Sequence, residues 1–283
     1  MDDGCTSMIA DPRGCVDYEE RGNGPTIVLV PGSCSTGAAW RPVLAAWDGR
    51  FRCVTTSLLG YGGTAERRTV HDAAMRHEAE AVEAVIGKAG GPVHLVGHSF
   101  GGLVAIAVAL RKRASLASLT IVEAPALELL RGDADRGHYR AIREMTDGYF
   151  TAFQRGDTEA VGAMIDFYGG AGTFASWPPR VRAYAVETTA VNILDWASAY
   201  GFALSAAALG AVDIPVLVLW GEASHPAVQR AGVLLAEGMR HTAAAEIKGA
   251  GHFMIATHAD VIGRLIAQHV HGAQALAEAS CPA

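Results

Sequence analysis

A glycine-rich turn between two apolar runs sets the strongest limit on how this 283-residue chain folds. Residues 93–96 are mostly apolar and predict a buried strand, and residues 103–110, which contain no proline or glycine, predict a buried helix. Ser99 lies between them in a Gly-x-Ser-x-Gly pattern. A sharp turn of this kind strains the serine backbone, and side chains at Gly97 and Gly101 would collide with the neighbouring strand or helix. The serine hydroxyl is then held out at the end of the strand, before a helix N-terminus that favours negative charge.

This five-residue pattern alone does not establish a reactive serine, because such patterns also occur by chance. A strand directly before the turn and a helix directly after it are the context that distinguishes a functional motif from a chance one. Both are predicted here. We therefore interpret Ser99 as a candidate nucleophile, with a chance glycine-rich turn as the alternative.

Predicted strands and helices alternate along both ends of the chain. This alternation is typical of an α/β protein that has a mostly parallel central sheet flanked by helices. Residues 1–15 are polar and are expected to lack regular structure, and residues 16–20 are expected to form an edge strand. The other strands are expected at 26–30, 52–58, 93–97, 116–122, 214–221 and 242–247, and the helices at 38–47, 71–88, 103–110, 226–237 and 260–270.

The middle of the chain has a different pattern. Between residues 126 and 209 the strand-like runs disappear and the spacing becomes helical. We interpret residues 1–124 and 211–283 as two parts of one α/β core, and residues 125–210 as a helical cap inserted over the carboxyl ends of the strands. Most of the aromatic residues lie in this segment. Aromatic residues at helical spacing usually pack in a core; the alternative is that some of these line an apolar pocket.

Composition and charge narrow the choice of partners and compartment. The net charge of −6 and the pI near 6.0 offer no basic excess for nucleic acid. No apolar run reaches about 18 residues, so no membrane span is expected, and the acidic N-terminus lacks the apolar core of a secretory signal. The five cysteines have no metal-type spacing and favour reduced thiols in a cytoplasmic protein. We expect a small-molecule substrate and no metal or other cofactor; no pattern predicts an oligomeric state.

A serine hydroxyl needs a base, and histidine is the base suited to neutral pH. Of the eleven histidines, His252 lies in a glycine-rich loop after a late predicted strand, where it could reach the turn at Ser99. His98 precedes the serine directly, so its side chain is expected to point away from the hydroxyl and to have a structural role. His94 lies within a predicted strand and is interpreted as a core histidine.

The order of these motifs resembles the α/β-hydrolase fold superfamily. It consists of a strand, a loop of small residues, Gly-His-Ser-Phe-Gly-Gly, a helical insertion and Gly-Ala-Gly-His-Phe, over residues 16–270. The resemblance implies Ser99 as the nucleophile and His252 as the general base and acid. It also implies an oxyanion hole built from the backbone N–H groups of Phe100 and of Ser33, with Cys34 as the neighbour of Ser33.

The third member of the catalytic triad departs from the common family pattern. Many relatives place an aspartate at the position of Ser224, and a hydroxyl cannot stabilise an imidazolium as a carboxylate does. Glu123, at the end of the preceding predicted strand, is our first candidate, because a buried unpaired charge is costly and needs a reason. Glu222 is the rival, and a site without an acid is the third possibility. Relatives also often carry an aspartate where this chain has Ser57, and His-Gly where it has Pro31-Gly32.

The residues and the resemblance together predict acyl transfer to water. Ser99 would attack an ester or related carbonyl, with His252 and Glu123 behind it. The apolar character of residues 125–210 favours a small-to-medium apolar substrate. A C–C hydrolase, a perhydrolase or a lyase could use the same residues, and a binding protein or receptor that keeps the pocket is the alternative from another class. A serine in place of a carboxylate at the turn argues against epoxide or haloalkane chemistry.

Overall fold

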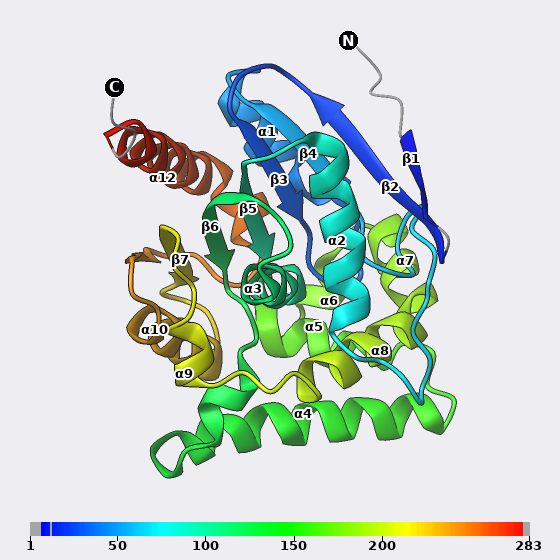
Figure 1. Ribbon diagram of the computed structural model, residues 1–283. Helices are drawn as coiled ribbons and strands as arrows, with labels where there is room; N and C mark the ends of the chain where they lie inside the picture. The colour runs from blue at the N-terminus through cyan, green and yellow to red at the C-terminus, as the bar shows by residue number, and fades with distance from the viewer. Residues whose placement is uncertain (1–6, 12, 280–283) are drawn as a thin grey trace.

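The computed structural model describes residues 7–11 and 13–279, and within these residues eight strands form one sheet (Figure 1). The strand order is β1-β2-β4-β3-β5-β6-β7-β8. β2 pairs antiparallel with both β1 and β4, and all other pairs are parallel. The predicted α/β class with a mostly parallel sheet is therefore confirmed. The strands are β1 (Ser7–Asp11), β2 (Gly14–Arg21), β3 (Thr26–Val30), β4 (Arg52–Thr56), β5 (Val93–His98), β6 (Leu116–Val122), β7 (Val216–Gly221) and β8 (Thr242–Ile247).

The central strands are buried on both faces, which is why their sequences are continuously apolar. In β3, Ile27 and Leu29 pack into one hydrophobic cluster, and Val28 and Val30 pack into another on the opposite face. This division follows from the two-residue period of a strand. The first cluster is completed by α1 (Arg41–Trp47) and α12 (Ala259–Ala279), and the second by α2 (Arg76–Ala89), α3 (Phe100–Arg111) and α10 (Pro226–Gly238).

All regular secondary structure between β6 and β7 is helical, and we call this segment the inserted helices. In Figure 1 the strands β3, β5 and β6 point down toward it, so it lies across the carboxyl ends of the sheet. The carboxyl ends of parallel strands are where open α/β sheets bind ligands. The segment comprises η2 (Leu127–Arg131), η3 (Asp133–Asp135), α4 (Arg136–Gln154), α5 (Val161–Gly169), α6 (Thr173–Ser176), α7 (Pro179–Glu187), α8 (Thr189–Tyr200) and α9 (Ala206–Leu209).

The N-terminal strands differ from the prediction. Residues 7–11 form β1 rather than irregular chain, and they pair antiparallel with β2, with Asp11 opposite Gly14. β2 therefore lies inside the sheet, and β1 is the edge strand. The apolar pattern does not reveal β1, because an edge strand that is partly exposed needs few apolar residues.

Other features of the described residues bear on the predicted compartment and cofactors. Cys15, Cys34 and Cys53 are free thiols, whereas Cys5, Cys281 and the start of the chain lie outside the described residues. Among those residues, no helix has the length and apolar character needed to cross a bilayer. The same residues contain no group of His, Cys, Asp and Glu side chains arranged to hold a metal ion.

Candidate active site

Ser99 occupies a sharp turn between β5 and α3 that only glycine neighbours permit. Its backbone has φ 54° and ψ −127°, a conformation that non-glycine residues rarely adopt and that costs about 1–3 kcal/mol. A Cβ atom on Gly97 would lie 2.3 Å from the carbonyl oxygen of Gly101, and one on Gly101 would lie 2.2 Å from that of Pro31. The predicted steric role of the two glycines is confirmed. The strain is held by the surrounding fold, including a bond from the Ser99 N–H to the Val122 carbonyl at 2.8 Å.

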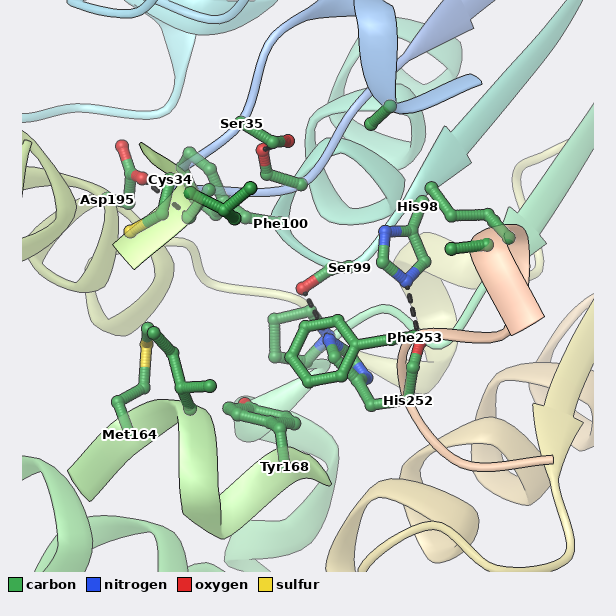
Figure 2. A pocket seen from close by; sticks show the side chains of 18 of the residues that line it. Cys34, Ser35, His98, Ser99, Phe100, Met164, Tyr168, Asp195, His252 and Phe253 are labelled. Atoms are coloured by element: carbon green, nitrogen blue, oxygen red, sulfur yellow. Dashed lines mark hydrogen bonds between the residues drawn. The ribbon is translucent and has the colours of Figure 1, made fainter. Parts of the chain in front are cut away.

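The structure brings Ser99, His252 and Glu123 together from three distant parts of the chain. His252 Nε2 lies 3.0 Å from Ser99 Oγ, and His252 Nδ1 lies 2.7 Å from Glu123 Oε2 (Figure 2 shows the serine and the histidine). His252 and Glu123 are both buried. A hydroxyl, an imidazole and a carboxylate in hydrogen-bonding series are the arrangement that activates a serine for attack on a carbonyl.

Glu123 is held as a carboxylate by three donors. It follows β6 with φ 50°, and its Oε1 accepts hydrogen bonds from the Gly221 N–H at 2.6 Å and from the Ser224 hydroxyl. Burial alone would raise the pKa of Glu123. The hydrogen bond and charge of His252, followed by the bonds from Ser224 and Gly221, outweigh it and hold the pKa below its usual value. The carboxyl group is therefore ionised at neutral pH and can face an imidazolium.

Glu222, the rival candidate for the acid, lies elsewhere, and Ser224 has a supporting role. Glu222 Oε2 accepts the N–H of Gly249 at 2.8 Å in the exposed loop before His252, and it does not contact the imidazole. Ser224, at the position where relatives carry an aspartate, donates its hydroxyl to Glu123. The serine thus supports a carboxylate that comes from the neighbouring strand.

His98 fixes the backbone of the histidine loop. Its Nε2 lies 2.9 Å from the carbonyl oxygen of His252, so the neutral ring donates this bond and faces the loop rather than the Ser99 hydroxyl (Figure 2). Burial, followed by the nearby His252, lowers the pKa of His98 to about 3. The ring therefore stays neutral in the folded protein at all ordinary pH values.

The depressed pKa of His98 predicts acid sensitivity of the fold. In the unfolded chain the ring takes up a proton below pH 6.5, whereas in the folded protein it does so only near pH 3. His98 should therefore lower the free energy of unfolding by about 3 kcal/mol as the pH falls from 7 to 4. Urea unfolding of His98→Gln, which does not titrate, should show a flatter pH dependence. The exposed His71→Gln is the control that should follow wild type; parallel curves for all three proteins would contradict the prediction.

The loop after β3 lies directly against the serine. A Cβ atom on Gly32 would lie 2.9 Å from Ser99 Cβ, so the close approach requires glycine. Ser33 and Phe100 line the same pocket as Ser99. In the described part of the chain, no backbone carbonyl accepts the amide hydrogen of either residue. Both N–H groups are therefore available for an anionic oxygen that forms beside Ser99.

A cavity of about 340 Å³ opens beside Ser99, at the small end of the range for small-molecule sites. None of its lining residues in the described part of the chain is a lysine or an arginine. Some aromatic residues of the inserted helices pack in the core and others line the pocket. Phe150 and Phe153 pack against the core, whereas Tyr168, Trp177 and Trp196 line the cavity. The lining residues from the inserted helices include Met164, Ile165, Tyr168, Trp177 and Trp196.

Comparisons with known proteins agree with this fold. The model of the alpha/beta hydrolase family matches residues 27–264, and the chain belongs to this family. Its structure is similar to that of a thermophilic esterase from Thermogutta terrifontis, with a TM-score of 0.73 and 22% identity over 95% of this chain and 99% of that one. An esterase from Exiguobacterium antarcticum also has a TM-score of 0.73, with 14% identity over 91% and 96% of the two chains.

Curated relatives match a shorter part of the chain and carry several names. A pimeloyl-[acyl-carrier protein] methyl ester esterase from Aeromonas hydrophila is 34% identical over 39% of this chain and 42% of its own length. A probable oxidoreductase, EphD, from Mycobacterium tuberculosis is 33% identical over 44% of this chain and 22% of its own. The chain thus spans less than half the length of these relatives. Their names differ, so they do not fix the reaction of this chain.

Proposed function

We propose that this protein is a serine hydrolase that cleaves an ester or related acyl bond of a small, uncharged substrate. The observation that carries the proposal is the 3.0 Å contact between His252 Nε2 and Ser99 Oγ, with Glu123 on the other ring nitrogen. A purely structural core does not require this arrangement. A serine on a strained turn destabilises the folded state and would bring no compensating contact there.

The proposed reaction proceeds in two half-reactions. His252 removes the proton of Ser99 as the hydroxyl oxygen attacks the substrate carbonyl, and Glu123 stabilises the imidazolium. The negative charge on the carbonyl oxygen is met by the N–H groups of Ser33 and Phe100. The imidazolium then gives its proton to the leaving alcohol, which departs and leaves an acyl group on Ser99. In the second half-reaction His252 takes a proton from water, the resulting hydroxide equivalent attacks the acyl group, and Ser99 is released with its proton restored.

We also propose that residues 125–210 act as a cap over an α/β core made of residues 1–124 and 211–283. The inserted helices supply Met164, Tyr168 and Trp196 to the pocket, so they would select the substrate while the core carries the chemistry. The names of some relatives include a haloalkane dehalogenase. Displacement of a halide at carbon needs a carboxylate nucleophile, and a serine at position 99 does not supply one.

The pocket predicts a preference for short uncharged esters. In a series of p-nitrophenyl esters from acetate to dodecanoate, kcat/KM should peak at short-to-medium chains, because a cavity of about 340 Å³ cannot enclose long ones. A p-nitrophenyl monoester of succinate should react at least about 100-fold more slowly than butyrate, since its carboxylate would be buried without a cation. Ser99→Ala is the control for background hydrolysis. Equal or faster turnover of the anionic ester would contradict the proposed substrate class.

A further inference from the structure

A buried charged cluster lies behind the loop that carries the proposed oxyanion donor. Arg68 Nη1 lies 2.7 Å from Asp195 Oδ1 and 2.9 Å from Glu78 Oε1, and the three side chains are at most 2% exposed. Asp195 comes from α8 of the inserted helices, whereas Arg68 and Glu78 belong to the chain between β4 and β5. Burying these charges costs free energy that apolar residues would not. The cluster therefore calls for an explanation beyond packing.

The second oxygen of Asp195 is used by the catalytic side of the molecule. Asp195 Oδ2 accepts the hydroxyl of Ser33 at 2.5 Å and the hydroxyl of Tyr61 at 2.7 Å. Ser33 and Asp195 are 162 residues apart in sequence, and both line the pocket. Figure 2 shows Asp195 beside Cys34 and Phe100, on the far side of Ser99 from His252. A carboxylate from the inserted helices thus bonds the side chain of the residue whose amide is the proposed oxyanion donor.

The loop around Ser33 has a backbone conformation that requires stabilising contacts. Gly32 has no side chain with which to anchor itself, and Cys34 has φ 56°, in the left-handed region that L-residues avoid. The chain direction therefore changes sharply immediately after Ser33. The bond from the Ser33 hydroxyl to Asp195 lies within this turn, together with a hydrogen bond from the Ser35 hydroxyl to the Gly32 carbonyl at 2.8 Å.

We propose that Asp195 is a positioning residue that acts through Ser33 to aim the Ser33 amide at the oxygen of the tetrahedral intermediate. This inference rests on the proposed function. Arg68 has a necessary part in it, because an unbalanced carboxylate near the oxyanion would oppose the charge that forms there. Arg68 also lies 2.8 Å from Glu66 Oε2, so its charge is shared between Glu66 and Asp195, while burial raises the pKa of Glu78.

The inserted helices therefore do more than shape the pocket. The hydrogen bond from Ser33 to Asp195 forms only when α8 packs against the loop after β3. The proposed oxyanion hole therefore depends on the inserted helices as well as on the α/β core. A change in α8 that breaks this contact should lower the stabilisation of the transition state more than the binding of the substrate.

A double-mutant cycle tests the proposal. Ser33→Ala, Asp195→Ala and the double variant are compared with wild type by kcat and KM for p-nitrophenyl butyrate and by the inhibition constant of a butylboronic acid, which forms a tetrahedral adduct on the serine. Each single variant should lose about 10- to 100-fold in kcat and in boronic acid affinity, with KM changed less than about threefold. The kcat and the boronic acid affinity of the double variant should be no lower than those of the less active single variant. The reason is that both substitutions remove the same Ser33–Asp195 contact.

Two further variants separate positioning from general damage. Asp195→Asn retains an oxygen for the Ser33 hydroxyl and should recover most of the loss. Tyr200→Phe removes a hydroxyl of the same helix that bonds to Thr146 and Arg143 in α4, and it should leave both constants near wild type. If Asp195→Ala does not fold, Ser33→Ala and Asp195→Asn still give the comparison.

The outcomes distinguish this inference from the proposed function. The role of Asp195 would be overturned if the fold-losses of the two single variants multiplied in the double variant. It would also be overturned if the loss appeared only in KM or in stability. In both cases ester hydrolysis by wild type would still support the proposed function. Absence of both hydrolysis and boronic acid binding in well-folded wild type would overturn the proposed function and the inference together.

Discussion

Replacement of Ser99 with alanine is expected to lower kcat for ester hydrolysis by about 10⁴- to 10⁶-fold, to the level of the reaction without a nucleophile. The reason is that the variant removes the hydroxyl oxygen that lies 3.0 Å from His252 Nε2 and that attacks the substrate in the proposed mechanism. Steady-state kinetics with p-nitrophenyl butyrate measure the loss.

The control for this variant is Ser176→Ala, which removes an exposed hydroxyl in α6 that donates to the Thr173 carbonyl. It should leave kcat within about twofold of wild type. The melting temperature of Ser99→Ala should also stay close to wild type, since alanine accepts the same backbone conformation no better and no worse than serine. A Ser99→Ala variant that keeps a tenth or more of the activity would exclude Ser99 as the nucleophile.

Replacement of Glu123 with glutamine is expected to lower kcat by about 10³- to 10⁴-fold. Glutamine keeps the volume of the side chain, but its amide cannot stabilise the imidazolium and can hold His252 in the wrong tautomer. The matched control is Glu222→Gln, whose carboxylate caps the turn at Gly249; its kcat should stay within about threefold of wild type. The reverse ranking of the two variants would show that Glu222 is the acid.

The position of Ser224 allows a second test of the same assignment. Because its hydroxyl already contacts Glu123, an aspartate introduced there lies near the histidine. Ser224→Asp in the Glu123→Ala background should restore at least about tenfold of the lost kcat. No recovery in a folded double variant would mean that the carboxylate must enter from β6.

The sequence was most informative where a local pattern carries a steric requirement. The turn at Ser99 was predictable because Gly97 and Gly101 have no room for a Cβ atom, and the central strands because both of their faces are buried. Glu123 was a candidate because a charge at the end of a buried strand needs partners. The structure now supplies them in Gly221, Ser224 and His252.

Contacts between residues far apart in the chain were not predictable in the same way. Asp17 accepts hydrogen bonds from the Ser57 N–H and hydroxyl and from the Gly63 N–H, at 2.8, 3.0 and 2.7 Å. It therefore places a carboxylate beside the position where many relatives carry an aspartate. That role depends on the pairing of β2 with β4, which no local pattern reveals. Asp195 was missed for the same reason, although a single carboxylate in the largely apolar α8 was an available signal.

The two serines that stand in place of a family aspartate follow one rule. Ser57 donates its hydroxyl to Asp17 and Ser224 donates its hydroxyl to Glu123. In each case the carboxylate comes from another strand or strand end and the serine helps to satisfy it. At both places a carboxylate and a serine hydroxyl are therefore paired across two strands or strand ends.

The reactivity of Ser99 is the central claim, and intact-mass spectrometry after treatment with a fluorophosphonate tests it most directly. Wild type should gain one adduct per chain, located by peptide mapping on the segment that contains Ser99. Ser99→Ala should gain none, and His252→Asn should react at least about 100-fold more slowly, because the hydroxyl has lost its base. A folded wild type that stays unmodified, or that carries the adduct on another residue, would contradict the mechanism.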